Sequence, residues 1–505
     1  MRDPAVKHRR GLITIVVMMA TIMYALDGTI ANVALPSIQG SLSATQEQVS
    51  WVITSYIVAS AIMTPLAGFC AMRFGLGRVL VIAVAGFTAV SMMCGAAQTL
   101  DQLVLFRALQ GAFGASLVPL SQALMMDTYP REEQGKAMAM WGVGTMLGPI
   151  TGPSLGGWLT DEYSWRWVFY VNLPVGVLCA IGLLILVRGK GNERPRPFDL
   201  LGFFLLAIAI GSFQLMLDRG QQLDWFDSPE IIAEALVAGV AFVMFLIHTL
   251  TDHHPFVSRE LFKDANLTVG LVLTGVCGLV LIVSATLMPP FLQQLKGYPV
   301  FTTGLVLAPR GIGMMVSMMM VSRLISRFDA RWIVALGFAV CALSLWEMTL
   351  FTLEVSEARI IWNGVVLGFG LGLVFPPLTT LTFATLPARL RTEGAAMNAL
   401  LRNLGASVGI AILVSLLARN TQENRADLVS QFTPYSMGWP FGKVVPGADP
   451  TMLAIWDGEI NRQAAMIGYL NDFRVMTICS LVVLPLLLMM RRQILVRSPV
   501  SVHVD

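Results

Sequence analysis

Long apolar runs alternate with short polar segments along nearly the whole chain. Fourteen of these runs have about the 20 residues that a helix needs to cross a bilayer. The pattern therefore predicts an all-α integral membrane protein with fourteen transmembrane helices. These predicted spans lie near residues 12–35, 50–71, 78–98, 102–124, 137–158, 167–187, 200–217, 230–250, 267–290, 303–322, 332–352, 359–380, 394–417 and 473–490.

The composition agrees with a membrane protein. Of 505 residues, 55% are hydrophobic and 13% are charged, whereas soluble proteins have about 25% charged residues. The first apolar run follows the basic segment "MRDPAVKHRR". This run is too long for a secretory signal and other spans follow it, so we interpret it as the first span.

Lysine and arginine are distributed unevenly between the loops. If the N-terminus lies in the cytoplasm, the cytoplasmic loops hold most of them, in line with the positive-inside rule. An even number of spans then places both termini in the cytoplasm. The small net charge of +3 reflects this topology, and we expect no nucleic-acid partner. The predicted cytoplasmic loops carry, among others, Arg131, Lys136, Arg188, Lys190, Arg323, Arg327, Arg389 and Arg391.

The chain also contains an internal repeat. Pro36 follows the first span as Pro289 follows the ninth, and "LVPLSQALMMDTYPRE" and "VFPPLTTLTFATLPAR" hold proline pairs with equal spacing. We predict two six-helix bundles in parallel repeat with two inserted helices, which is typical of transporters that rock two halves about a midplane site. The expected divisions are 1–187 (N-terminal bundle), 188–258 (linker with two extra helices), 259–490 (C-terminal bundle with a long loop at 419–472) and 491–505 (cytoplasmic tail).

Asp27 is an acidic residue well inside the first predicted span. A charge at the centre of a membrane helix costs at least roughly 2.5–3.5 kcal/mol, so such residues usually have a function. Burial disfavours the ionised form of a carboxyl group, whereas a nearby arginine favours it. A carboxyl group that is both buried and close to an arginine can therefore bind and release a proton, and we predict that Asp27 does so. The alternative is a helix kink in which Thr29 or Asn32 satisfies Asp27.

The fourth predicted span carries Arg107, Gln110, Gly111 and Gly114 on one face, because residues three, four and seven apart align on a helix. Arg107 can either snorkel to the membrane surface or point into the bundle. The glycines indicate a helix contact on this face and favour the second arrangement. We therefore predict that Arg107 adjusts the proton affinity of Asp27.

Other polar residues in the spans are further candidates for the substrate pathway or for coupling. The thirteenth predicted span repeats the pattern of the fourth with an asparagine and an arginine, and a third intramembrane arginine lies in "LAPRGIGM". Glu347 lies near the end of its span and can reach water. These further candidates are Asn32, Gln110, Arg310, Asn398 and Arg402.

Glycine recurs every fourth residue in the fifth predicted span, at Gly144, Gly148, Gly152 and Gly156. Bare backbone on one face allows a neighbouring helix to approach closely. Pro149 and Pro153 are also four residues apart and should bend the helix. Close packing is one explanation of such a groove, and a functional contact between helices is the other.

Several other classes of protein are excluded. The chain has no GxxxxGK[ST] phosphate loop, so a nucleotide-driven pump is not expected. Its five histidines have no metal-ligand spacing and its six cysteines form no CxxC pair, so we predict neither a metal site nor a disulfide framework. No nucleophile–base pair stands out, and we expect no enzyme.

Several motifs together resemble the major facilitator superfamily, in its fourteen-span drug:proton antiporters of the EmrB/QacA type. "LDGTIANVALP" (26–36), "LFRALQGAFGA" (105–115) and "GPITGPSLGG" (148–157) are similar to motifs of the first, fourth and fifth helices of that family. "WRWVFYVNLPVG" (165–176) and "LDRGQQLDWF" (217–226) look like features of the fourteen-span branch. The resemblance covers essentially the whole chain.

The resemblance implies the major facilitator fold and proton-coupled multidrug efflux by alternating access across the bacterial cytoplasmic (inner) membrane. It implies no cofactor, with the proton gradient as the energy source. The implied partners are lipophilic compounds, the lipid bilayer, a periplasmic adaptor (a membrane-fusion protein) and a TolC-type outer-membrane channel, which together make a tripartite pump. An exporter of one endogenous metabolite or siderophore is the alternative. A channel or receptor is a different class, against which the repeat and the antiporter motif count.

Two packing motifs follow from the same resemblance. The loop motif retains Gly68, Arg73, Gly75 and Arg78 but has Met72 where the wider family has aspartate. EmrB-like members also tend to lack that aspartate, and its absence weakens any expectation of an aspartate latch. The antiporter motif implies a sealed contact that prevents proton leakage. Its residues are Gly144, Gly148, Pro149, Gly152, Pro153, Gly156 and Gly157.

The segment 420–473 is longer than any other predicted loop. Its aromatic residues argue against disorder, and long ordered loops usually have a function. Ile460, Ala464 and Ile467 have helical spacing, which predicts a helix leading into the fourteenth span. The segment is either a lid over the transporter's own opening or a docking surface for the adaptor.

Overall fold

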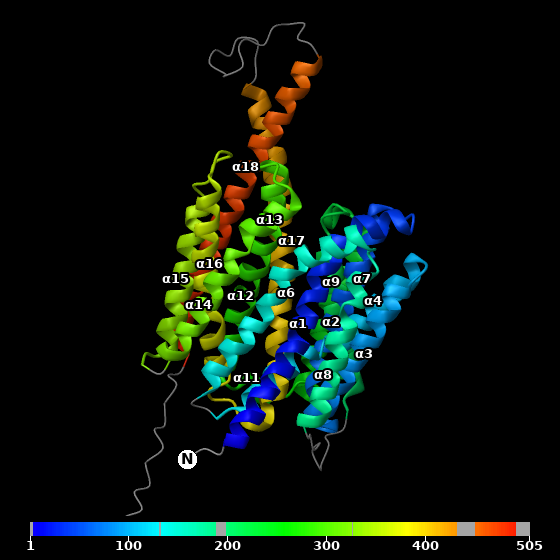
Figure 1. Ribbon diagram of the computed structural model, residues 1–505, viewed down its shortest axis with the longest axis vertical. Coiled ribbons are helices and arrows are strands. Elements are labelled where there is room, and N and C mark those ends of the chain that lie inside the picture. The colour runs from blue at the N-terminus through cyan, green and yellow to red at the C-terminus, as the bar shows by residue number, and fades with distance from the viewer. Residues whose placement is uncertain (1–3, 131–132, 188–197, 326, 432–449, 491–505) are drawn as a thin grey trace, which may run out of the picture.

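A computed structural model describes residues 4–130, 133–187, 198–325, 327–431 and 450–490 (Figure 1). Every regular element in these ranges is a helix, so the predicted all-α class is confirmed. The elements are α1 Pro4–Ser41, α2 Gln46–Phe74, α3 Leu76–Ala96, α4 Leu100–Gly114, α5 Leu117–Thr128, α6 Gln134–Glu162, α7 Trp167–Tyr170, α8 Asn172–Leu186, α9 Leu200–Arg219, η2 Trp225–Asp227, α10 Pro229–Thr251, α11 Arg259–Phe262, α12 Ala265–Pro290, η3 Phe291–Leu295, α13 Val300–Leu307, α14 Pro309–Leu324, α15 Ala330–Met348, α16 Glu357–Thr382, η4 Ala388–Leu390, α17 Arg391–Gln431, α18 Pro450–Val482 and η5 Leu484–Met489.

Thirteen segments within the described ranges are long and apolar enough to cross a membrane. The fifth predicted span is not among them, but it lies within α6. The 29 residues of α6 extend about 43 Å at 1.5 Å per residue, which is more than the thickness of a hydrocarbon core. The helices are therefore consistent with the predicted fourteen spans.

Side-chain caps explain where several helices begin. Thr45 forms a capping box with Gln48 at the start of α2: each backbone N–H donates to the other residue's side-chain oxygen. Such caps satisfy N–H groups that the first helical turn leaves without partners. Side chains also cap α4, α9, α12, α15 and α16, and these caps are Thr99, Asp199, Asp264, Asp329 and Ser356.

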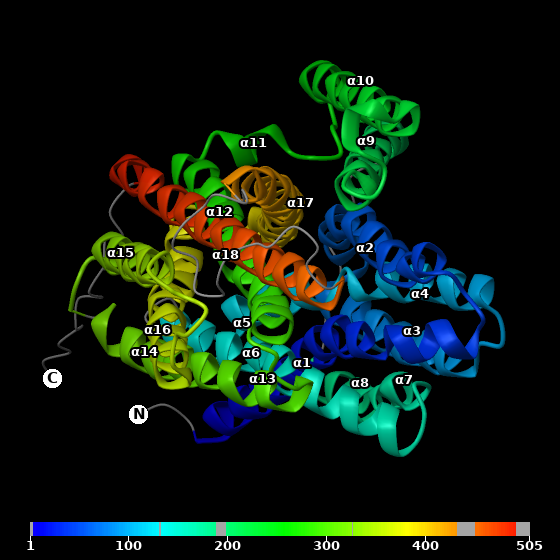
Figure 2. The ribbon, with the colours of Figure 1, turned by 90° about the horizontal axis from the view of Figure 1, so that it is seen from above.

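The helices form two halves, with an additional helix pair beside them (Figure 2). The first half contains α1 to α8 and the second half contains α12 to α18. Helices α9 and α10 pack against each other, and α9 contacts both α2 and α17. We call the side on which α1 begins and η5 ends the terminal side, and the opposite side the loop side (Figure 1).

Matched contacts in the two halves reproduce the internal repeat. Trp141 Nε1 of α6 donates to Thr21 Oγ1 of α1 at 3.1 Å, and Thr274 Oγ1 of α12 donates to Asn398 Oδ1 of α17 at 2.9 Å. Thr274 follows Thr21 by the same interval as Pro289 follows Pro36, and Asn398 follows Trp141 as Pro376 follows Pro119. The prolines that indicated the repeat therefore also give its register in three dimensions.

A second matched contact involves two glycines. A methyl group on Gly111 of α4 would lie 2.3 Å from the carbonyl oxygen of Tyr56 in α2. On Gly368 of α16 it would lie 2.0 Å from the carbonyl oxygen of Arg310 in α14. Both positions require glycine because helix backbones meet there. Gly368 is thus the counterpart of Gly111.

The two halves meet through side chains near the terminal ends of their helices. Gly68 of α2 lies against Glu393 of α17. Trp141 of α6 stacks on Phe375 of α16, with ring centroids 5.8 Å apart. Toward the loop side, Gly28 of α1 has open space beside it and Asn32 is exposed. The halves are thus packed together on the terminal side.

Helices α17 and α18 continue beyond the bundle on the loop side as a projecting pair (Figure 1). Arg425 of α17 forms an ion pair with Asp457 of α18 at 2.8 Å. The predicted helix ahead of the fourteenth span is confirmed, because α18 begins at Pro450. The expectation of a loop from residue 419 is wrong for residues 419–431, which are helical in α17. Residues 432–449 lie outside the described ranges.

Candidate functional site

Asp27 lies on α1 in the interior of the first half, with no exposed surface. Its Oδ2 accepts a hydrogen bond from Arg107 Nη1 of α4 at 2.7 Å. Its Oδ1 accepts from Gln110 Nε2 at 2.8 Å and from Asn172 Nδ2 of α8 at 3.0 Å. Three helices thus meet at one carboxyl group, and the structure brings together the two residues that we predicted to act in coupling.

The face of α4 positions Arg107 for this contact. Arg107 is 1% exposed, so it points into the bundle and does not snorkel. Its Nη1 also donates to Gln110 Oε1 at 2.8 Å and its Nε to the carbonyl oxygen of Val52 at 3.1 Å. The Tyr56 ring lies 4.1 Å from the guanidinium carbon, a distance typical of cation–π contacts. The guanidinium is therefore held from several directions.

The contacts of Asp27 exclude the alternative of a side chain capped by its neighbours. Thr29 donates to the carbonyl oxygens of Ala25, Leu26 and Gly148, and α1 continues as a helix past this point to Ser41. Asn32 is exposed. Neither residue satisfies Asp27 through any hydrogen bond that the structure describes.

Asn172 is a member of this network that the sequence did not indicate. It lies at the start of α8 with 1% exposed surface, and its Nδ2 also donates to Ser91 Oγ of α3 at 3.0 Å. An asparagine inside "WRWVFYVNLPVG" is an unusual polar residue in an apolar run. That polarity was the available signal, but the sequence does not say which helix it faces.

The glycine groove of α6 faces α1. A methyl group on Gly148 would lie 2.6 Å from the backbone of Ala25 and Leu26, and one on Gly152 would lie 2.1 Å from Thr29. Gly144 and Gly156 face the same helix, whereas Gly157 has open space beside it. The groove therefore joins two helices of the first half, on either side of Asp27. The side chains of Pro149 and Pro153 lie outside what the structure describes.

The loop motif lies at the terminal side. Gly75 adopts φ +91° between α2 and α3, a backbone conformation that favours glycine. Arg73 and Arg78 are exposed. Gly68 lies against the second half, where a methyl group would be 3.1 Å from Glu393 Cα. Within this motif, Gly68 is thus the residue whose contact joins the halves.

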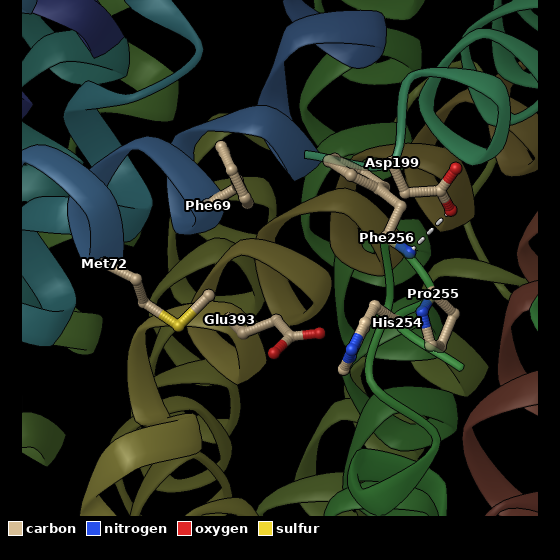
Figure 3. Close-up of a pocket in the computed structure, with 7 residues that line it drawn as sticks. All are labelled: Phe69, Met72, Asp199, His254, Pro255, Phe256 and Glu393. Carbon is tan, nitrogen blue, oxygen red and sulfur yellow. Dashed lines mark hydrogen bonds between the residues drawn. The ribbon is translucent and has the colours of Figure 1, made fainter. Parts of the chain in front are cut away.

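A small cavity lined by Phe69 and Glu393, among others, lies at the junction of α2, α17 and the connector 252–258 that follows α10 (Figure 3). Asp199 accepts the backbone N–H of Phe256 at 2.9 Å and contacts His248 Nε2 at 2.9 Å. Glu393 accepts the backbone N–H of Ser258. The inserted helix pair is therefore fastened by its connector to the terminal end of α17.

The other predicted polar residues are not gathered at Asp27. Arg310 Nη2 donates to Ser284 Oγ at 2.8 Å and to the carbonyl oxygen of Leu281 at 3.0 Å. Asn398 is buried and accepts from Thr274. Glu347 pairs with Arg359 at 3.2 Å near the loop side. These residues belong to contacts within the second half.

Arg402 lies between the halves. Its guanidinium carbon is 5.9 Å from the Phe375 ring, and Tyr24 of α1 is close enough to interact with it electrostatically. Trp141 of α6 stacks on the same Phe375 ring, and Met318 of α14 lies against Gly142 of α6. Among the acidic groups that the structure describes, none forms an ion pair with Arg402.

Two halves related by a parallel repeat, with a carboxyl group buried among three helices of one half, are an arrangement typical of transporters that move two halves about a midplane site. The sequence model of the Major Facilitator Superfamily matches residues 17–410. The chain belongs to this superfamily, in the branch that contains EmrB.

Two curated relatives support that placement. The multidrug export protein EmrB of Escherichia coli K12 is 35% identical over 427 residues, covering 84% of this chain and 83% of its own. The fatty acid resistance protein FarB of Neisseria gonorrhoeae is 34% identical over 479 residues, covering 94% of each chain. The protein is therefore a multi-pass membrane protein of a transporter family.

Solved structures share the fold at much lower sequence identity. The human organic anion transporter MFSD10 has a TM-score of 0.61 at 11% identity, covering 95% of this chain and 100% of its own. The proton:xylose symporter XylE has a TM-score of 0.60 at 13% identity, covering 94% and 95%. These likenesses show the architecture alone.

Proposed function

We propose that the protein exports lipophilic compounds across the bacterial cytoplasmic membrane in exchange for protons. The observation that carries this proposal is the buried network of Asp27. Protonation of the carboxyl removes the charge that Arg107 and Gln110 of α4 and Asn172 of α8 all contact. Proton binding at Asp27 therefore weakens the attachment of α1 to two other helices of its half.

Alternating access supplies the rest of the proposed cycle. The halves are packed together on the terminal side, where Gly68 meets Glu393. Lysine and arginine are concentrated in the loops of this side, so the positive-inside rule places it in the cytoplasm. With this orientation, we propose that the packed terminal side belongs to the state of the cycle that is closed toward the cytoplasm. Proton exchange at Asp27 would shift the equilibrium toward the opposite state.

The surroundings of Arg402 favour lipophilic acids among the substrates. Arg402 is a cation between the halves with no ion-pair partner among the described acidic groups. Phe375 supplies apolar surface beside it, and Trp141 stacks on Phe375. A compound with a carboxylate and an apolar body fits this combination, because the anion compensates a charge that is costly to leave unpaired. The relation to a fatty acid resistance protein agrees with this class.

We further propose that the projecting part of α17 and α18 binds a periplasmic adaptor, a membrane-fusion protein that connects the transporter to a TolC-type outer-membrane channel. The pair extends away from the bundle (Figure 1), and most side chains of residues 420–430 are exposed or half-buried. A lid would instead pack over the bundle. This geometry favours the docking surface of the two alternatives.

Flux measurements in proteoliposomes test the transport proposal. With an imposed pH gradient, the wild-type protein should accumulate a fluorescent lipophilic acid against its concentration gradient and release protons in the opposite direction. Arg402→Gln should reduce accumulation of the acid more than that of a neutral compound of similar size. Movement that stops at equal concentrations would instead identify a channel.

An exporter of one endogenous metabolite or siderophore is the alternative within the same mechanism. The range of compounds transported distinguishes a multidrug exporter from an exporter of one compound. Competition by structurally unrelated lipophilic acids should inhibit transport if the protein is a multidrug exporter, whereas inhibition by a single compound class would favour the dedicated exporter.

A further inference from the structure

Asp472 of α18 is a second buried carboxyl group in the interior of the protein. It has no exposed surface, and neither Oδ1 nor Oδ2 has a hydrogen-bond partner among the described residues. Asp27, by contrast, has three donors. A buried carboxylate without a cation or donors is far less stable than the neutral acid. This structure therefore favours Asp472 with its proton bound.

The internal repeat places Asp472 opposite a residue that already belongs to the coupling network. "FYVNLPVGVLCAIGLL" (169–184) aligns without gaps with "YLNDFRVMTICSLVVL" (469–484). Cys179 then pairs with Cys479 and Asn172 with Asp472. In the first half, Asn172 donates to Asp27. The last long helix of the second half thus carries an acid where that of the first half carries an amide.

The first helix of each half shows the complementary change. At the interval that relates Thr21 to Thr274, the counterpart of Asp27 is Val280, which is fully buried. The counterpart of Arg107, at the interval that relates Gly111 to Gly368, is Gly364. Two positions of the repeat are thus compared, Asp27 with Val280 and Asn172 with Asp472. Each half has an acid at one of them, on α1 in the first half and on α18 in the second. The second half has no arginine to match Arg107.

Among the residues that the structure describes, the helices around Asp472 place no unpaired cation beside it. Tyr469, one turn earlier, is the titratable group that interacts with it. On α17, Arg419 pairs with Glu423, and on α15, Glu347 pairs with Arg359.

The remaining neighbours in the described part of the chain are also neutral or already bonded; Lys296, which follows η3, donates to the carbonyl oxygens of Leu353 and Val355 at 2.8 Å. Helix α12 contains no charged residue or histidine between Ala265 and Pro290. On α18, Arg474 is exposed and donates to Asn471 at 3.3 Å. Aromatic rings pack beside Asp472 along α18, where Phe291 of η3 lies against Tyr469 with centroids 5.4 Å apart.

We propose that Asp472 is a second proton-binding carboxyl group of the transport cycle. It carries its proton in the state packed together on the terminal side and releases it to water when α17 and α18 move apart. Gly468, one turn earlier, packs against Leu417 and Thr421 of α17, so separation of these helices exposes this face of α18. The inference rests on the proposed proton antiport and adds a second proton to it.

The number of protons exchanged per substrate tests the proposal. In proteoliposomes, simultaneous measurement of proton release and substrate accumulation should give a ratio lower by one for Asp472→Asn than for the wild type. Asp472→Glu keeps a carboxyl group and should keep the wild-type ratio. Asp101→Asn is the matched control: it makes the same change at an exposed residue in the first turn of α4 and should leave the ratio unchanged.

The outcomes separate this inference from the proposed function. A wild type without proton countertransport would contradict both. A proton-coupled wild type with an unchanged ratio in Asp472→Asn would contradict only the role of Asp472. If the asparagine variant misfolds, infrared spectra of the wild type and of Asp472→Glu test whether Asp472 is protonated. The carbonyl band of a protonated buried acid should be present in the wild type and shift in this variant, and an unshifted spectrum would overturn the proposal.

Discussion

The guanidinium of Arg107 and the carboxylate of Asp27 form an ion pair, 2.7 Å from Nη1 to Oδ2, with at most 1% of either side chain exposed. The pair connects α4 to α1 in the interior of one half. Because Gln110 and Asn172 contact the other carboxylate oxygen, a change in the charge of Asp27 is felt by three helices.

We expect Asp27→Asn to abolish proton-driven efflux while the protein remains inserted in the membrane. The amide has nearly the shape of the carboxyl group but cannot exchange a proton. Substrate accumulation in inverted membrane vesicles measures the effect, with the abundance of the variant as the control. Full transport with unchanged pH dependence would remove Asp27 from the mechanism.

Arg107→Ala should be almost as damaging as Asp27→Asn, and Arg107→Lys less so. The alanine variant leaves a buried carboxylate without its cation, which typically costs about 3–5 kcal/mol. Lysine restores the charge but not the simultaneous contacts of the guanidinium with Asp27, Gln110 and Val52. Thermal unfolding in detergent and vesicle transport should rank wild type above lysine above alanine. Equal activity of the two variants would show that charge is not the relevant property.

Gly148→Val should separate α1 from α6 and abolish transport, because a methyl group at Gly148 already lies within 2.7 Å of Ala25 and Leu26. Gly157→Ala is the matched control on the same helix, since nothing lies within 4 Å of the added methyl group. Both are measured by protein yield in membranes and by efflux. Normal efflux by Gly148→Val would contradict the close contact.

Replacing residues 422–452 with a short Gly/Ser linker should leave flux across the inner membrane intact in vesicles. It should abolish co-purification with the adaptor and resistance in whole cells, because the end of α17 and the first residues of α18 are removed while the bundle is retained. The single variant Arg425→Ala, which breaks the ion pair with Asp457, is the milder companion. Full resistance after replacement would contradict the docking role.

Reporter fusions test the orientation of the chain. A reporter that is active only in the periplasm should be active at Gly220 and Gly442 and silent at Gly191, because the positive-inside rule places residue 191 in the cytoplasm. Activity at Gly191 would reverse the assignment of the two sides.

The sequence was sufficient for the helices and for the central pair of the site. Hydropathy located the spans, and the cost of a charge in a membrane singled out Asp27 and Arg107. Periodicity could not show which helices are neighbours, so Asn172 was missed although it donates to Asp27. For the same reason the sequence could not show where Asn32 lies. It is exposed on α1, and its place in the substrate pathway stays a prediction.

The predicted boundaries of the last two spans explain why the sequence missed Asp472 and the extension of α17. The fourteenth span was expected to begin at residue 473, which left Asp472 in a predicted loop, although α18 begins at Pro450. Hydropathy falls where a helix leaves the bilayer, even when the helix itself continues. The polar residues from 419 to 431 therefore indicated a loop, whereas they extend α17 to Gln431.

One helix, α17, runs from the terminal side to the tip of the projecting pair. Its 41 residues span about 60 Å at 1.5 Å per residue, with Glu393 near one end and Arg402 about a quarter of the way along. A stiff rod of this length behaves as a lever: a tilt of a few degrees at the substrate region becomes a displacement of several ångströms at the tip. A partner bound at that tip would be displaced during each transport cycle. A fluorophore attached there would detect the cycle from outside the membrane.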